Sequence, residues 1–187
     1  TNGLPEFGTD HLIKEFEELI ALHDASNIAA LIIEPVAGSA GVVVPPKGYL
    51  KKVREMCDKH NILLIFDEVI TAFGRMGSMT GAEEFGVTPD ILNMAKQITN
   101  GVIPMGAVIT SSEIYDTFMA AGGPEYMVEL PHGYTYSGHP IACAAGLASL
   151  EILEQEQMPQ RVKAMSQYFA EAIHSLKGSD NILDIRN

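Results

Sequence analysis

Three ionisable residues stand directly after runs of apolar residues, where their side chains could do chemistry. Asp67 follows the unbroken apolar run Ile62 to Phe66, and Glu34 and Lys96 follow similar runs. Short apolar runs of this kind are typical of strands in a parallel sheet that is buried on both faces. Because an open α/β sheet binds its ligands beyond the carboxyl ends of its strands, we expect all three side chains at one ligand-binding edge.

The combination of an acid and a lysine points to a particular chemistry. Taken singly, an Asp often begins a loop and a Lys is most often a solvated surface charge. An electron-sink cofactor with a pyridine ring, however, needs a lysine for its Schiff base and an acid that keeps the ring nitrogen protonated. Lys96 and Asp67 fit these two roles.

The periodicity of the chain predicts an α/β fold. A helix around Tyr49 to His60 separates the apolar runs Ile28 to Ile33 and Ile62 to Phe66, which is the pattern of a strand–helix–strand crossover in a parallel sheet. The other predicted elements are helices from about Asp10, from Ser111 through Phe118, from Ile141 to Gln155 and from Pro159 to Leu176, and strands at Ile91 to Ala95, at Gly106 to Thr110 and from Asn181.

The composition excludes several classes of function. The 187 residues are 47% hydrophobic and carry a net charge of −12, which argues against a nucleic-acid or anionic-membrane partner. No apolar run approaches the roughly 20 residues of a membrane span. The two cysteines and six histidines lack metal-ligand spacing, so we expect no metal site and a reducing, intracellular compartment. The chain begins without Met, and we expect it to be an internal piece of a longer protein.

Several motifs together resemble those of the class III pyridoxal-phosphate aminotransferases. The two most telling are F-D-E-V-I-T-A-F-G-R at Phe66 to Arg75 and A-K-Q-I-T-N-G at Ala95 to Gly101. The resemblance continues through Ile32 to Val42, Val44 to Leu50, Gly86 to Asp90, Ile103 to Val108 and His132 to Pro140, and so covers nearly the whole chain. Within the class, the motifs are most similar to the ω-amino acid–pyruvate (β-alanine–pyruvate) aminotransferase group.

The resemblance implies a fold and a domain division. The fold would be the large domain of a fold type I pyridoxal-phosphate enzyme, a mostly parallel sheet flanked by helices. It would be incomplete in this chain. Residues 1–155 would belong to this cofactor-binding domain, and residues 156–187 would form a linking helix and the start of a small C-terminal domain.

The resemblance also implies a role for five residues. Lys96 would form the Schiff base with pyridoxal 5'-phosphate and later act as the base of the proton shift. Asp67 would pair with the pyridinium nitrogen, and Val69, two residues on along an extended backbone, would pack against the ring. Thr135 would donate its hydroxyl to the cofactor phosphate of a neighbouring subunit, in a homodimer or tetramer with shared active sites. Glu34 would support the cofactor site by orienting its neighbours rather than by transferring protons.

Two departures from the family pattern concern substrate choice. Many members have Gln where this chain has Ile70, and the ornithine and γ-aminobutyrate types have Glu where it has Ser39. Both departures fit the ω-amino acid–pyruvate group. Glu68 is expected to be a supporting residue, because strand alternation points it away from Asp67. For Arg75, a structural role is favoured over a role in binding substrate carboxylate.

The expected function is therefore transfer of an amino group from an ω-amino acid or amine, such as β-alanine, to pyruvate in the cytoplasm. The alternatives within the cofactor class are an aminomutase, a decarboxylase and a 2-oxoglutarate-dependent aminotransferase. A P-loop ATPase fragment is a further alternative, but the chain has no G-x-x-x-x-G-K-[ST] motif. A non-catalytic homologue would be expected to lack Lys96 or Asp67. The phosphate-cradling loop and the substrate-binding arginine of the family would lie outside this chain, so we expect these residues alone to be inactive.

Overall fold

The computed structural model describes residues 7–130, 132 and 134–186. In chain order the elements are α1 (Thr9–His23), η1 (Ala25–Asn27), β1 (Ala30–Ile33), α2 (Tyr49–His60), β2 (Leu63–Asp67), α3 (Gly81–Phe85), β3 (Ile91–Met94), η2 (Lys96–Ile98), β4 (Ala107–Thr110), α4 (Ser112–Ala121), α5 (Pro140–Gln155) and α6 (Met158–His174).

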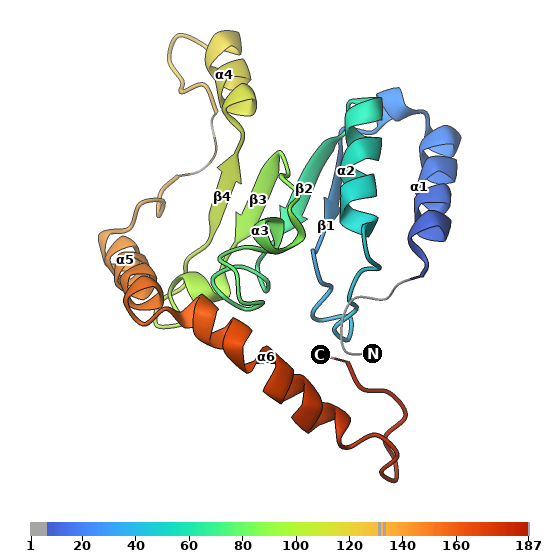
Figure 1. Cartoon of the computed structure of the whole chain (residues 1–187). Coiled ribbons are helices and arrows are strands. Elements are labelled where there is room, and N and C mark those ends of the chain that lie inside the picture. Colours follow the sequence, from blue (N-terminus) through green and yellow to red (C-terminus); the bar gives the residue numbers. More distant parts are fainter. Residues whose placement is uncertain (1–6, 131, 133, 187) are drawn as a thin grey trace.

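The four strands form one mixed sheet in the order β1-β2-β3-β4 (Figure 1). The first three strands are parallel, and β4 runs antiparallel to β3. The β1–α2–β2 segment is the predicted crossover unit. The α/β fold class with its mostly parallel sheet is confirmed.

Helix α2 has the predicted bounds because both of its ends are fixed by left-handed residues. Gly48 precedes the helix with φ 80°, and Asn61 ends it with φ 54°, a conformation that Gly and Asn tolerate best. Leu50, Val53 and Cys57 recur at helical spacing and are buried against the sheet.

One face of the sheet is covered by α1 and α2, and the main core lies there (Figure 1). Leu64 and Phe66 of β2 are fully buried and pack with Val53 of α2 and Ile20 of α1. Burying several such side chains contributes about 1.5–3 kcal/mol each. This layer holds β2 rigidly behind the residues at its carboxyl end.

The opposite face of the sheet is open in the described part of the chain. It carries Ile32, Leu63 and Val108, which are 56%, 38% and 68% exposed. The expectation that β1 and β2 are buried on both faces is therefore wrong for this chain. The apolar runs match a sheet with two covered faces, but the described residues supply helices for only one.

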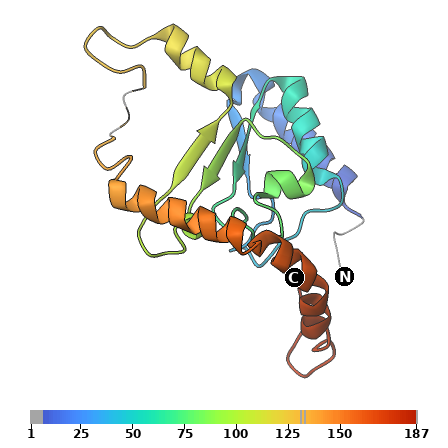
Figure 2. The same cartoon turned by 60° about the vertical axis from the view of Figure 1, so that its left-hand side comes forward.

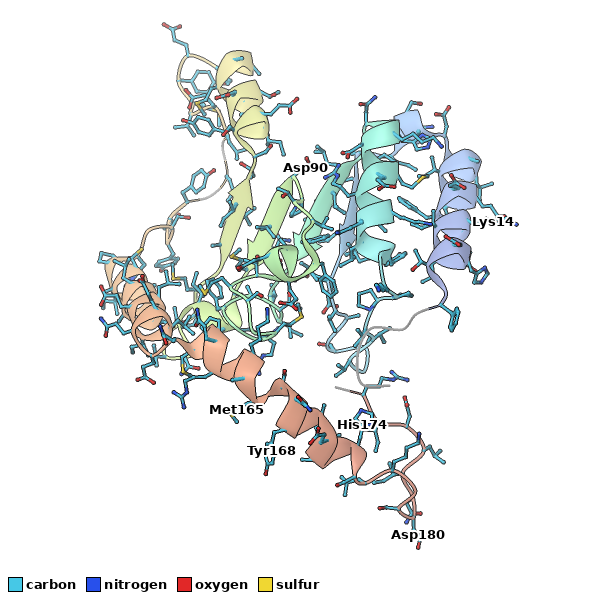
Figure 3. The ribbon with its side chains drawn as sticks, in the orientation of Figure 1. Lys14, Asp90, Met165, Tyr168, His174 and Asp180 are labelled. Carbon is cyan, nitrogen blue, oxygen red and sulfur yellow. The ribbon has the colours of Figure 1, made fainter. Side chains whose placement is uncertain are left out.

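An ion pair fixes the amino end of the parallel strands. Arg54 Nη1 of α2 lies 2.8 Å from Asp90 Oδ2, just before β3, and the same oxygen accepts a hydrogen bond from Leu64 N at 2.7 Å. Figure 3 shows Asp90 at the end of the sheet remote from α6. The pair aligns β2 with β3, and this register places the residues at their other ends.

Helices α5 and α6 run past the carboxyl ends of the parallel strands (Figures 1 and 2). Helix α5 packs against η2, while α4 projects from the far end of β4. The strand predicted from Asn181 is absent: the described residues beyond α6 are turn and irregular backbone, since none of them pairs with another strand. Within the described residues, no helix combines the length and the hydropathy needed to cross a membrane.

Candidate active site

Glu34, Asp67 and Lys96 all lie at the carboxyl ends of the parallel strands. Ile33 of β1 pairs with Phe66, so Glu34 and Asp67 are the next residues on neighbouring strands. Asp67 in turn lies opposite Asn93 of β3, and Lys96 follows two residues after that strand ends. The prediction that these residues end adjacent strands of one sheet is confirmed.

The carboxylate of Asp67 keeps one oxygen available at this edge. Its side chain is half-buried, and Oδ1 accepts a hydrogen bond from Val69 N at 3.0 Å. Among the described residues, none donates a hydrogen bond to Oδ2. The turn therefore fixes the carboxylate through one oxygen and leaves the other to accept a proton-bearing nitrogen from a ligand.

Lys96 stands in an unusual backbone conformation. It begins η2 with φ 50°, in the left-handed region that non-glycine residues rarely occupy. The side chain is exposed, and its ammonium forms no ion pair with the described residues. Strained residues of this kind concentrate at functional sites, where the surrounding structure imposes them.

Glu34 holds the loop that follows β1. Its Oε2 accepts a hydrogen bond from Gly38 N at 3.0 Å, at the start of a tight hairpin in which Ala37 and Val43 exchange two backbone hydrogen bonds. A Cβ on Gly38 would lie 2.9 Å from Ile70 Cδ1, so a larger residue at this position would have to displace the Ile70 side chain. Glu34 thus orients a neighbouring loop, as predicted.

The segment after Asp67 is a turn rather than a continuing strand. Strand β2 ends at Asp67, and Val69 and Ile70 lie in turn conformation. The argument that Val69 shares a side of an extended backbone with Asp67 is therefore wrong, because the Asp67–Val69 hydrogen bond closes the chain into a turn. The contact of Val69 with a cofactor ring stays a prediction. Glu68 is buried.

The sequence reasoning missed one residue near the site, Asn93, and the hydrogen-bond partners of a second, Glu68. Asn93 is a register partner of Asp67 and a polar residue inside the apolar strand β3, which is the signal that could have found it. Glu68 accepts hydrogen bonds from Gly81 N and Ala82 N of α3, a helix the sequence analysis did not predict.

Thr135 lies in a different part of the structure from the other candidate residues. It lines a cavity of about 560 Å³ together with the loop Ile103–Gly106 and the first turn of α5. None of Glu34, Asp67 and Lys96 lines this cavity. Its neighbours Tyr134 and Tyr136 are exposed. Within one chain, the structure does not bring Thr135 to the other candidate residues.

An apolar cavity of about 700 Å³ lies between the loops beyond β1 and β2 and the helix α6. Its walls include Ile70 and Phe73 on one side and Met165 and Phe169 of α6 on the other; Figure 3 labels Met165. Arg75 lines it too, is exposed, and has no ion pair or hydrogen bond within the described part of the chain. The structural role favoured for Arg75 is not supported by any contact.

The donor set at the sheet edge suits a pyridine-ring cofactor better than a metal ion. Asp67 offers a carboxylate oxygen to a ring nitrogen, and Lys96 offers an unpaired amine for a Schiff base. The described residues contain no group of three or more His, Cys, Asp or Glu side chains arranged to hold a metal.

Comparison with known proteins agrees with this chemistry. Residues 4–187 match the model of the aminotransferase class-III family. The chain is 61% identical to the β-alanine–pyruvate aminotransferase of Pseudomonas aeruginosa and 62% identical to the ω-amino acid–pyruvate aminotransferase of Pseudomonas putida. Both alignments include all of this chain and 42% of the relative, so the chain spans about two fifths of their length.

Solved structures show the same fold. An (S)-enantioselective ω-transaminase from Thermomicrobium roseum matches with a TM-score of 0.89 and 42% identity, over 96% of this chain and 39% of that one. A PLP-bound amine transaminase from an uncultivated Pseudomonas species matches with a TM-score of 0.85 and 50% identity, over 90% of this chain and 37% of that one. Pyridoxal phosphate is the cofactor of the class. From its sequence, its fold and the residues at its sheet edge, this chain belongs to the class-III aminotransferases.

Proposed function

We propose that the whole protein transfers an amino group from an ω-amino acid or an amine, such as β-alanine, to pyruvate. The observation that carries the proposal is the position of Lys96 and Asp67 at the carboxyl ends of two adjacent strands, with one oxygen of Asp67 available. The names of the relatives that are 61% and 62% identical supply the substrate class. Ile70 and Ser39, at the positions where glutamate-dependent members differ, support pyruvate over 2-oxoglutarate.

In this proposal Lys96 has two successive tasks. Its amine binds the cofactor covalently, and after the substrate amine has displaced it, the freed amine moves the proton from the substrate carbon. The bound cofactor supplies an electron sink for the bond that breaks. No carboxylate among the described residues forms an ion pair with Lys96, which supports the covalent attachment, because its amine is not held by another side chain.

Asp67 and Glu34 are assigned binding and orienting tasks. Asp67 Oδ2 would accept a hydrogen bond from the protonated ring nitrogen of the cofactor, so that a negative charge stabilises the positive ring. Glu34 holds the Gly38 loop against Ile70 and thereby shapes one wall of the site. Val69 is assigned to the ring face.

The proposal makes the active site a property of two subunits. Thr135 lies on a cavity apart from Lys96, which supports the view that its hydroxyl serves the cofactor phosphate of a neighbouring subunit. The proposed assembly is a homodimer or tetramer in the cytoplasm, a location supported by the two free cysteines.

We further propose that residues 1–155 belong to the cofactor-binding domain and residues 156–187 to a linker and a second domain. Gln157, with φ 49°, separates α5 from α6 and supports a boundary there. The open apolar face with Ile32 and Val108 supports the view that this chain alone binds the cofactor poorly.

The test is an assay of the full-length protein with pyridoxal phosphate, β-alanine and pyruvate. The proposal predicts alanine formation that requires both substrates. Glutamate formation from 2-oxoglutarate in preference to alanine would favour the alternative aminotransferase type. Conversion of β-alanine without any keto acid would favour an aminomutase or a decarboxylase.

A further inference from the structure

A buried acid lies beside Asp67 and has no task in the proposed reaction. Glu68 is 0% exposed, although it directly follows a half-buried residue at the sheet edge. No Lys, Arg or His within the described ranges forms an ion pair with it. A buried carboxylate is costly unless hydrogen bonds replace its hydration, so its presence calls for a structural reason.

The carboxylate of Glu68 joins two separate segments of chain. Oε2 accepts hydrogen bonds from Gly81 N at 2.6 Å and from Thr71 Oγ1 at 2.8 Å, and Oε1 accepts one from Ala82 N at 2.7 Å. One acid thereby ties the turn that follows β2 to the beginning of α3. An amide side chain offers a single acceptor oxygen and could not accept from both backbone N–H groups through two oxygens.

The backbone of Glu68 is fixed as well. Its N–H donates to Asn93 O at 2.8 Å, and its carbonyl accepts from Ala72 N at 3.0 Å. Every polar group of this residue is therefore hydrogen-bonded. The peptide group that joins Asp67 to Glu68 is thereby held in place, and with it the backbone from which the Asp67 side chain leaves.

A third segment, the end of β1, also packs close to the Glu68 carboxylate. A Cβ on Gly81 would lie 2.8 Å from Pro35 Cβ and 3.1 Å from Glu68 Oε2, so glycine is required for the close approach. Pro35 directly follows Glu34 at the end of β1. The ends of β1 and β2 and the start of α3 thus meet around one buried carboxylate.

We propose that Glu68 is the positioning residue of this site: its buried carboxylate fixes the turn that aims Asp67 at the ring nitrogen of the cofactor. The proposal rests on the proposed function, in which Asp67 has that partner. Its distinguishing consequence is that loss of the Glu68 hydrogen bonds alters the cofactor's environment, and does not only loosen the fold.

The experiment compares three variants of the full-length protein loaded with pyridoxal phosphate. Glu68→Gln removes one acceptor oxygen, Thr71→Val removes one donor while keeping the shape, and Thr80→Ala is the matched control. Thr80 Oγ1 accepts a hydrogen bond from Glu83 N at 3.0 Å, so its loss loosens the same end of α3 without touching Glu68. The readouts are the cofactor dissociation constant, the midpoint of the pH titration of its visible absorption, and Tm.

For Glu68→Gln we expect a cofactor dissociation constant raised about tenfold, the loss expected for one hydrogen bond to a charged group. The titration midpoint is expected to move, with a smaller change of the same sign in Thr71→Val. Thr80→Ala is expected to lower Tm without changing the other two readouts.

Wild-type cofactor affinity and midpoint in both Glu68→Gln and Thr71→Val would overturn the inference, even if Tm fell. If Glu68→Gln does not fold, Thr71→Val decides by the same criterion. A full-length wild-type protein that bound no pyridoxal phosphate would overturn the proposed function and this inference with it.

Discussion

Asp67 and Asn93 lie opposite each other on adjacent parallel strands, and this pairing brings Lys96 to the edge of the sheet that holds the Asp67 carboxylate. Three further observations concern the same end of the sheet. The acid is anchored through Oδ1, the lysine is exposed in a strained conformation, and the apolar cavity beside α6 lies beyond the same strand ends.

The first prediction concerns the charge of Asp67. In the full-length protein, Asp67→Asn keeps the shape of the side chain and removes the negative charge that stabilises a protonated ring nitrogen. We expect kcat/KM for β-alanine and pyruvate to fall by about 10²- to 10³-fold, the usual effect of losing one electrostatic partner. Steady-state kinetics measures it. Asp58→Asn, which removes a surface partner of Arg54, should leave kcat/KM nearly unchanged.

A second prediction tests the sharing of the site between subunits. Thr135→Val removes the hydroxyl proposed to bind the neighbour's cofactor phosphate, and we expect the cofactor to bind about tenfold more weakly. Lys96→Ala removes the covalent attachment in the subunit that carries it. A homo-oligomer of either variant alone should have very low activity when the cofactor is limiting.

Hybrid dimers made of one Lys96→Ala subunit and one Thr135→Val subunit give the deciding measurement. If Thr135 serves the neighbour, one of the two sites keeps both residues, and about half of the wild-type activity per dimer should return. Hybrids no more active than the Thr135→Val protein would place Thr135 in the site of its own subunit and contradict the proposal.

Sequence reasoning correctly placed Glu34, Asp67 and Lys96 at the ends of adjacent strands, because the signals for that placement are local and chemical. Apolar runs ending in Asp67 and Lys96 and the left-handed caps Gly48 and Asn61 are readable one segment at a time. The predictions that failed depended on packing and pairing partners that a local stretch of sequence does not show. The two-sided burial expected of β2 depends on a layer that the described residues do not supply, and a strand from Asn181 requires a neighbour with which to pair.

The turn after β2 was mispredicted for a similar reason. Alternation along an extended strand predicted the direction of Val69, but a hydrogen bond between Val69 N and Asp67 Oδ1 ends the extended conformation. Helix α3 did carry a readable signal: Thr80 and Glu83 form a capping box, in which Thr80 accepts from Glu83 N and Glu83 accepts from Met79 N, close to the reciprocal pattern of that motif. The glycines around it obscured that signal.

A third prediction concerns the stability of the strand register. Asp90→Ala leaves Leu64 N and the guanidinium of Arg54 without their partner at the half-buried amino end of the sheet. We expect the free energy of unfolding to fall by about 1–3 kcal/mol, measured by urea denaturation of the full-length protein. Asp10→Ala, which removes the exposed partner of Lys52, should lower the free energy of unfolding much less, because solvent screens an exposed ion pair. Equal losses would contradict the structural role assigned to Asp90.

A fourth prediction concerns the thiol of Cys57. Burial, with further contributions from Asp58 and Asp90, raises the pKa of this thiol from 9.0 to about 11, against the lowering effect of Arg54. At pH 8 only about one such thiol in a thousand is ionised, so iodoacetamide should leave Cys57 unmodified in the native protein and modify it in urea. Rapid native modification at pH 8, located by peptide mass spectrometry, would contradict this.

The raised pKa of Cys57 also determines how the stability of the fold changes with pH. Because the folded-state pKa of Cys57 lies above the ordinary value, the neutral thiol stabilises the fold fully below pH 9, and this contribution is lost as the pH rises through about 11. Cys57→Ala should therefore flatten the alkaline decline in Tm.

The most direct test of the account is the identity of the lysine that holds the cofactor. The full-length protein is incubated with pyridoxal phosphate, reduced with sodium borohydride, digested and examined by mass spectrometry. The proposed function predicts a phosphopyridoxyl group on the peptide that contains Lys96, retained in a Lys52→Ala control and lost in Lys96→Ala. A stoichiometric label on another lysine, or no stable label on the wild-type protein, would contradict it.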